Sequence, residues 1–247
     1  MFLYQLNNSF INQSIVSHQD NSLTVGDCLS DNQDNYYLVL GDTIHRPHLY
    51  KVGLAPSLLS SVAPQLLSSV TLNLIHHLVY EYYTTYTNII KLYLPNDISK
   101  LLKKKSPLSS SKITAKKASS EKLTLIIMPD RRTIVNQQDQ YHYTLDQAIW
   151  SQHTINQDIK LFRDIKHGEN SNTGATANTW EKKTPWVEKT IVCTPGECFW
   201  DYWNLSQIIL VDPHKWYYKS QQEPRYDIAR VCELMAHYYW CILTTNT

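Results

Sequence analysis

Hydrophobic and polar positions alternate in short runs over residues 1–54, a pattern typical of β-strands. The clearest strand is predicted at residues 36–40, and Gly41 and Asp42 form the turn that follows it. Residues 44–52 are predicted to return as its hairpin partner. Pro47 then takes an edge position or a bulge, because proline has no backbone N–H to donate. We therefore expect the chain to begin with a β-rich region.

Residues 65–94 show helical periodicity, because apolar residues recur there every three to four positions as far as Pro95. One continuous helix of this length spans about 45 Å. The run from Tyr80 to Thr87 is rich in Tyr and Thr, which favour strands. The pattern therefore fits either one long helix or two shorter helices.

The C-terminal half alternates predicted strands with predicted helices. Thr144 and Gln147 match a capping box, and helical spacing continues to a stop at Gly168, which predicts a helix at 144–167. A final helix is predicted after Pro224, with one apolar stripe that runs from Ile228 to Ile242. Short apolar runs predict strands at 123–128, 133–135, 190–193 and 207–211.

These elements predict an α+β fold with a mixed, mainly antiparallel sheet. About three to four helices accompany the sheet, one of them carried in an insertion in the N-terminal half. Residues 1–99 are interpreted as a β-rich start followed by a helical segment, and residues 100–122 as a basic flexible linker. Residues 123–247 are interpreted as an α+β region that packs with the first region to form one compact unit.

The basic segment concentrates charge in a chain whose formal net charge is only +1. It has few apolar residues to bury and is expected to be mobile when unbound. Lysines can follow a phosphate backbone without reading base sequence, and the two arginines after the next strand can bind phosphate bidentately. A solvated loop is the alternative interpretation. The candidate phosphate-binding residues are Lys103, Lys104, Lys105, Lys112, Lys116, Lys117, Lys122, Arg131 and Arg132.

Composition excludes several classes of protein. With 6 glycines among 247 residues, the chain has no glycine-rich phosphate loop and no dinucleotide fingerprint. Aromatic residues make up 11% of the chain, which is too many for a disordered protein, and no apolar run is long enough to span a membrane. Charged residues make up 18%, so uncharged polar groups and Tyr must cover much of the surface. This profile fits a subunit that contacts other proteins, because Tyr and Trp are enriched at interfaces. A compositional bias of the source genome explains the profile equally well.

The 5 cysteines form no even disulfide framework, and no leader peptide is recognisable, so a reducing cytoplasmic location is the expectation. No cofactor motif is recognisable. A tetrahedral zinc site from Cys193, Cys198, His237 and Cys241 is chemically allowed, but its spacing lacks the short pairs typical of zinc sites. Ordinary buried cysteines are the favoured alternative, so no metal is predicted.

Two predicted strands end in residues that carry chemistry. Asp130 follows the strand at 123–128, while Asp212, His214 and Lys215 follow the strand at 207–211. Strand ends present catalytic groups in α/β folds, so these four residues are candidates for metal-dependent phosphodiester hydrolysis. The alternative interpretation is a pair of plain turns, since Pro-Asp and Asp-Pro both start turns.

The sequence therefore favours a non-catalytic role over an enzyme. The first hypothesis is a subunit of a larger, ribonucleoprotein-type assembly. Its aromatic and amide-rich surface contacts other protein subunits, and residues 103–122 contact nucleic acid, RNA more than DNA. The alternatives are the hydrolase and a protein-binding adaptor without nucleic acid. No membrane partner is expected.

Overall fold

The computed structural model forms two compact units, each of which is described by itself. The first unit comprises Met1–Ser109 together with two later segments, Phe199–Tyr202 and Lys219–Tyr238. The second comprises the remaining residues. The structure describes residues 1–6, 14–18, 23–45, 47–56, 58–63, 66–94, 98, 102, 122–130, 134, 143–145, 188–202, 205–221 and 224–246.

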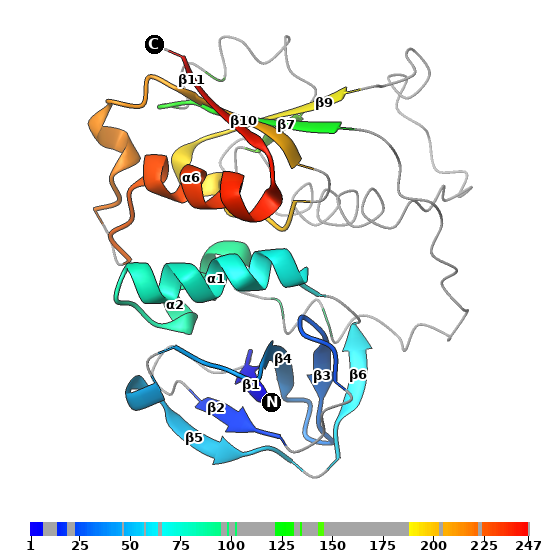
Figure 1. Cartoon of the computed structure of the whole chain (residues 1–247). Helices are drawn as coiled ribbons and strands as arrows, with labels where there is room; N and C mark the ends of the chain where they lie inside the picture. The colour runs from blue at the N-terminus through cyan, green and yellow to red at the C-terminus, as the bar shows by residue number, and fades with distance from the viewer. Residues whose placement is uncertain are drawn as a thin grey trace, which may run out of the picture. The chain divides into compact units, whose positions relative to one another are not determined.

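The first unit contains sheet A, which has the strand order β5-β2-β1-β4-β3-β6 (Figure 1). All neighbouring strands are antiparallel except β2 and β5, which are parallel. The mainly antiparallel sheet and the α+β composition confirm the predicted fold class. The strands are β1 (Phe2–Gln5), β2 (Ser14–Ser17), β3 (Cys28–Ser30), β4 (Tyr36–Gly41), β5 (Lys51–Leu54) and β6 (Ser60–Ala63).

The central strand β4 is buried along its whole length, which explains its unbroken apolar sequence. Tyr37 and Val39 pack on one face of sheet A with Leu3 of β1. The next residue of β1, Tyr4, points to the other face, where its hydroxyl donates a 2.9 Å hydrogen bond to Thr87 Oγ1. The helix that carries Thr87 therefore covers this second face.

Two helices follow sheet A, α1 (Ser69–Glu81) and α2 (Tyr86–Tyr93). The two shorter helices are therefore the correct alternative, and the break lies within the Tyr- and Thr-rich run. Ser68 caps α1, since its Oγ accepts the Thr71 N–H at 3.2 Å. The carboxylate of Asp201 accepts the Ser68 N–H at 2.9 Å and the Thr71 hydroxyl at 2.6 Å. An acid 130 residues away in sequence thus fixes the start of α1.

The end of α1 is a left-handed turn at Tyr83, where φ is 51°. The N–H of Thr84 then donates to the carbonyl of Val79 at 3.3 Å, the bond that closes a Schellman motif. Glycine usually occupies this position because it has no Cβ to clash. Among the described residues, four residues other than glycine adopt this left-handed conformation: Asp34, Tyr83, Asp212 and Trp240.

The predicted hairpin of residues 36–40 with 44–52 is wrong. The strand β4 pairs with β1 and β3, whereas the following strand β5 pairs with β2 in parallel. A short 3-10 helix, Pro47–Leu49, precedes β5. Because a parallel pair needs a crossover rather than a tight turn, no hairpin signal in the sequence specifies this pairing.

The helix α6 (Ile228–Tyr239) belongs to the first unit as far as Tyr238 and confirms the helix predicted after Pro224. The prediction that its apolar stripe extends to Ile242 is wrong, because Trp240 turns the chain with φ 54° and Ile242 begins a strand. Among the described residues, no helix is both long and apolar enough to cross a membrane.

Sheet B, in the second unit, is parallel throughout and has the strand order β11-β10-β7-β9-β8 (Figure 1). The strands at 123–128, 190–193 and 207–211 were predicted and are confirmed. The start of the predicted helix at 144–167 is wrong, because 143–145 is a strand, and residues 146–167 lie outside the described residues. The strands are β7 (Lys122–Ile127), β8 (Tyr143–Leu145), β9 (Glu188–Cys193), β10 (Leu205–Val211) and β11 (Ile242–Asn246).

Part of the predicted strand at 133–135 also falls outside the described residues. Within it the structure describes only Ile134, which is helical and buried. The packing of residues 1–99 and 123–247 into one compact unit stays a prediction.

A glycine in the first unit gives a test of the backbone packing inside that unit. Gly26 has φ +94°, and a Cβ built there lies 2.0 Å from the carbonyl oxygen of Leu67. We expect Gly26→Ala to lower the free energy of unfolding by roughly 2 kcal/mol or more, because both the backbone and the neighbouring carbonyl are strained. Urea unfolding measures this loss.

The matched control is Gly53→Ala, where the nearest atom to a new Cβ is Val16 Cγ1 at 3.6 Å, an ordinary contact. Equal stability of Gly26→Ala and Gly53→Ala would contradict the described turn.

Candidate functional site

The carboxyl ends of β7 and β10 meet at one edge of sheet B. In the sheet, β8 and β9 lie on one side of β7, whereas β10 and β11, which follow later in the sequence, lie on its other side. The strand order therefore reverses between β7 and β10. In parallel α/β sheets, ligands bind outside the carboxyl ends of the strands at such a reversal.

This edge brings together the strand-end residues that the sequence singled out. Ile127 pairs with Leu210, so Asp130 and Asp212 follow neighbouring strands at the same edge. The strand β9 also ends there, at Cys193, whose carbonyl accepts the Met128 N–H at 2.9 Å. The antiparallel sheet expected from the sequence does not predict this convergence, because only parallel strands place successive carboxyl ends together.

The segment 212–218, called here the β10 loop, is held at both ends. At its start, Asp212 has φ 49°, and its N–H donates to the carbonyl of Asn246 at 2.7 Å. At its end, the buried Tyr218 hydroxyl contacts the carbonyl oxygens of Ile127, at 3.2 Å, and of Val211. The Tyr218 hydroxyl thus connects the carboxyl ends of β7 and β10.

Between these anchors the side chains of residues 214–216 are exposed. The Lys215 N–H donates to the carbonyl of Asp212 at 3.1 Å, and the Tyr218 N–H donates to the carbonyl of Lys215 at 3.2 Å. His214 and Lys215 are exposed, and Trp216 is 66% exposed. The loop therefore presents two basic side chains and one indole on a backbone fixed by hydrogen bonds.

The basic candidates fall mostly outside the part of the chain that the structure describes. Lys122 is described, and it begins β7 with an exposed side chain. The other candidate lysines and both arginines lie outside the described residues: Lys103, Lys104, Lys105, Lys112, Lys116, Lys117, Arg131 and Arg132. Phosphate binding by this set stays a prediction.

The zinc candidates are divided between the two units. Cys193, Cys198 and Cys241 belong to the second unit, whereas His237 lies on α6 in the first. Burial raises the pKa of Cys241 to about 11, so its thiol stays protonated near neutral pH, where metal binding requires a thiolate. Within the described ranges, no three His, Cys, Asp or Glu side chains form a group suited to a metal ion.

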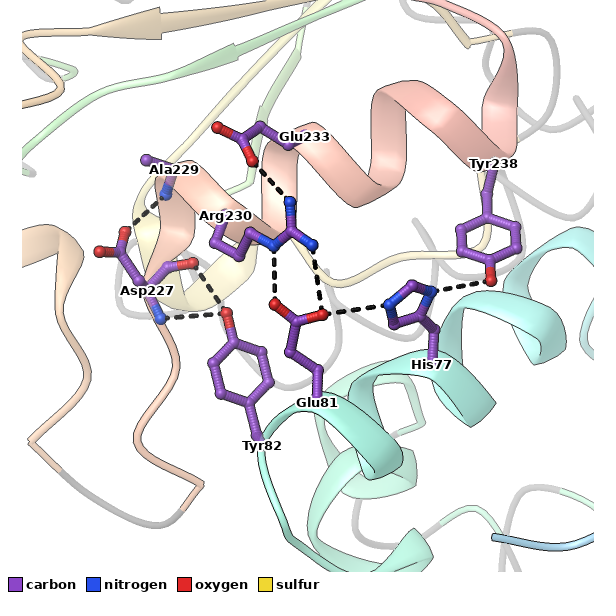
Figure 2. Close-up of polar contacts among 8 residues, drawn as sticks. All are labelled: His77, Glu81, Tyr82, Asp227, Ala229, Arg230, Glu233 and Tyr238. Atoms are coloured by element: carbon purple, nitrogen blue, oxygen red, sulfur yellow. Dashed lines mark hydrogen bonds and ion pairs between the residues drawn. The ribbon is translucent and has the colours of Figure 1, made fainter.

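A second polar cluster, missed by the sequence analysis, joins α1 to α6 within the first unit (Figure 2). Arg230 donates from Nε to Glu81 Oε1 at 2.7 Å and from Nη2 to Glu81 Oε2 at 3.3 Å, a bidentate pair. The same guanidinium reaches Glu233 at 2.8 Å. The hydrogen bond from Arg230 is the main cause of the lowered pKa of Glu81.

The cluster continues along α1 to His77 (Figure 2). Its Nε2 lies 3.1 Å from Glu81 Oε2 and its Nδ1 lies 3.0 Å from the Tyr238 hydroxyl. With a carboxylate on one side, Nε2 donates, so Nδ1 accepts from Tyr238. A His–Glu pair resembles part of a catalytic dyad, but here both imidazole nitrogens are engaged. Nδ1 contacts Tyr238 of α6, whereas Nε2 contacts Glu81 of its own helix, which in turn binds Arg230 of α6. We therefore interpret the cluster as structural.

The start of α6 is tied to the end of α1 in the same cluster (Figure 2). Asp227 caps α6, since its carboxylate accepts the Ala229 N–H at 2.9 Å. The Tyr82 hydroxyl lies 3.3 Å from the carbonyl oxygen and 3.4 Å from the nitrogen of Asp227. Burial is the main reason that the pKa of Tyr82 rises to about 12, so it remains a neutral donor at physiological pH.

A third polar group, centred on the half-buried His76, joins sheet A to α1 and α2. His76 Nε2 lies 3.0 Å from the carbonyl of Leu40 and therefore donates to it, while Nδ1 accepts from the fully buried Tyr86 hydroxyl. That hydroxyl in turn accepts the His45 N–H at 3.1 Å. Burial lowers the pKa of His76, which favours the neutral imidazole at neutral pH.

This imidazole makes the stability of the first unit depend on pH. The unfolded chain protonates His76 near pH 6.5, whereas the folded chain does so only at lower pH. Below pH 6.5 the unfolded state therefore binds more protons, and we expect the free energy of unfolding to fall as pH decreases towards 5. Chemical unfolding at several pH values measures this slope.

The variant His76→Gln should flatten the slope, because Gln can donate to Leu40 but does not titrate. The matched control is His48→Gln on an exposed side chain, which should leave the slope unchanged. An unaltered slope in His76→Gln would exclude His76 as the cause.

The sequence was also compared with known proteins. It matches no protein-family model, and no curated protein sequence matches it.

Proposed function

We propose that this chain is a non-catalytic subunit of a larger assembly that handles nucleic acid, RNA more than DNA. The observation that carries this proposal is the segregation of charge along the sequence. Seven lysines lie between residues 103 and 122 with Glu121 as the one acid among them, in a chain of net charge +1. Such a segment supplies a local positive field for phosphates. The rest of the chain has 16 basic residues (23 less 7) against 21 acids (22 less 1), so the positive charge is concentrated in this segment.

Contacts with other protein subunits are assigned to exposed aromatic and apolar side chains. Tyr83 is 80% exposed and Trp240 is 91% exposed, each at a left-handed turn directly after a helix. A bulky side chain at such a turn costs about 1–2 kcal/mol relative to glycine. Large aromatic residues held in a strained conformation and turned to the surface favour a role in contacts with partners.

The lysine segment gives the direct test. In the full-length protein, replacing the seven lysines with Gln should weaken binding of single-stranded RNA and reduce its salt dependence. Each lost phosphate contact should lower the slope of log K against log salt by about 0.7. Fluorescence anisotropy with a labelled oligonucleotide at several salt concentrations measures both quantities.

A matched pair of double variants separates position from charge. Lys116→Gln/Lys117→Gln should lower the slope, whereas Lys51→Gln/Lys91→Gln, which removes the same charge elsewhere, should not. RNA affinity that does not change with salt concentration would refute the role of the segment. Equal slopes of log K against log salt in the two double variants would also refute it.

The hydrolase remains the second candidate, because sheet B places Asp130 and Asp212 after neighbouring strands at one edge. Its chemistry requires a divalent ion held by carboxylates. If this candidate is correct, RNA or DNA is cleaved only with Mg²⁺ or Mn²⁺, and Asp130→Asn and Asp212→Asn each abolish cleavage. The proposed non-catalytic role instead requires that the nucleic acid is recovered intact with either ion. Asn suits position 212 because it tolerates the left-handed backbone.

A further inference from the structure

The β10 loop combines two features that a single-stranded nucleic acid requires. Trp216 is 66% exposed, and the residues before it, His214 and Lys215, are also exposed. An aromatic ring stacks on an unpaired base, and a neighbouring cation contacts the phosphate beside that base. The segment 103–122 contains no aromatic residue, so the lysines alone give no stacking surface.

The loop is also rigid enough to present these groups together. Asp212 is fixed by its 2.7 Å hydrogen bond to Asn246 on β11, and Tyr218 is 1% exposed and contacts the ends of β7 and β10. Trp216 lies two residues from the buried Tyr218. Because the backbone is already ordered, little conformational entropy is lost when a ligand binds to the exposed side chains.

The edge of sheet B gives the ligand a direction. Asp130 and Asp212 lie at the strand ends, and carboxylates repel phosphates but accept hydrogen bonds from hydroxyl groups. A single-stranded nucleic acid that lies across the β10 loop would therefore keep its phosphates near Lys215. Its sugars would face the carboxylates, where a ribose 2′-hydroxyl is a donor that deoxyribose lacks.

We propose that the β10 loop is a binding site for single-stranded nucleic acid, in which Trp216 stacks on one base and Lys215 contacts the adjacent phosphate. This inference rests on the proposed function, since it adds a stacking contact to an electrostatic one. A duplex is not a ligand for this site, because its bases already stack on one another.

The test uses the full-length protein and a single-stranded oligoribonucleotide that contains the fluorescent base 2-aminopurine. Stacking of that base on an indole quenches its fluorescence. We expect the natural protein to quench this fluorescence. Trp216→Phe should quench it less, but still measurably. With Trp216→Leu we expect no quenching and affinity weaker by roughly 5- to 150-fold, the range for loss of one stacked base.

The matched control is Tyr80→Leu. Tyr80 is 61% exposed and lies on α1 in the first unit, outside the β10 loop. This variant should keep both quenching and affinity. Equal losses in the two variants, or binding of an RNA duplex that falls with Trp216→Leu, would overturn the assignment of the loop.

The same measurements separate this site from the lysine segment. If Trp216→Leu binds like the natural protein while the seven-lysine variant does not, the β10 loop is not a binding site and the proposed function stands. If the seven-lysine variant keeps full affinity and only Trp216→Leu loses it, the role of the segment is refuted and the loop is supported. If the natural protein binds no single-stranded nucleic acid at low salt, both are refuted.

Discussion

The parallel pairing of β7 with β10 is the interaction on which the candidate site depends. It places the carboxyl ends of two strands at one edge of sheet B. These strands are far apart in the sequence: Ser206 of β10 donates a hydrogen bond to the carbonyl of Leu123 of β7, which lies 83 residues earlier. Asp130 and the β10 loop meet there for that reason alone. The Tyr218 hydroxyl then joins the two strand ends through the carbonyls of Ile127 and Val211. Without this pairing, Asp130 and Asp212 would lie in two unrelated turns.

The two proposed functions make opposite demands on this edge of sheet B. A hydrolase needs carboxylates that hold a divalent ion, whereas a nucleic-acid contact needs cations and an aromatic surface. The described loop offers Asp212, His214, Lys215 and Trp216 in sequence. Its exposed lysine and indole are the groups on which the proposed nucleic-acid contact depends.

Glycine scarcity has a structural consequence that links the fold to the proposed contacts. Four left-handed positions are occupied by Asp34, Tyr83, Asp212 and Trp240. Aspartate tolerates this conformation, whereas Tyr and Trp are strained in it. The two strained aromatics both end helices and are both turned to the surface. The polar cluster of Glu81 and Arg230 holds these helices together and thus fixes where Tyr83 is presented.

The sequence by itself determined the elements whose signals are local. Unbroken apolar runs predicted β4, β7, β9 and β10, and helical spacing predicted α1, α2 and α6, because burial acts on each residue through its near neighbours. The tertiary structure alone decided which strands pair. The parallel β2–β5 pair, the parallel order of sheet B and the strand at Tyr143–Leu145 all depend on partners far along the chain, and a capping-box pattern at Thr144 was overridden by pairing with β9. The candidates Asp130, Asp212, His214 and Lys215 were identified from sequence, but Trp216 was not. The loop exposes Trp216 and buries Tyr218 two residues later, and no local pattern encodes that choice.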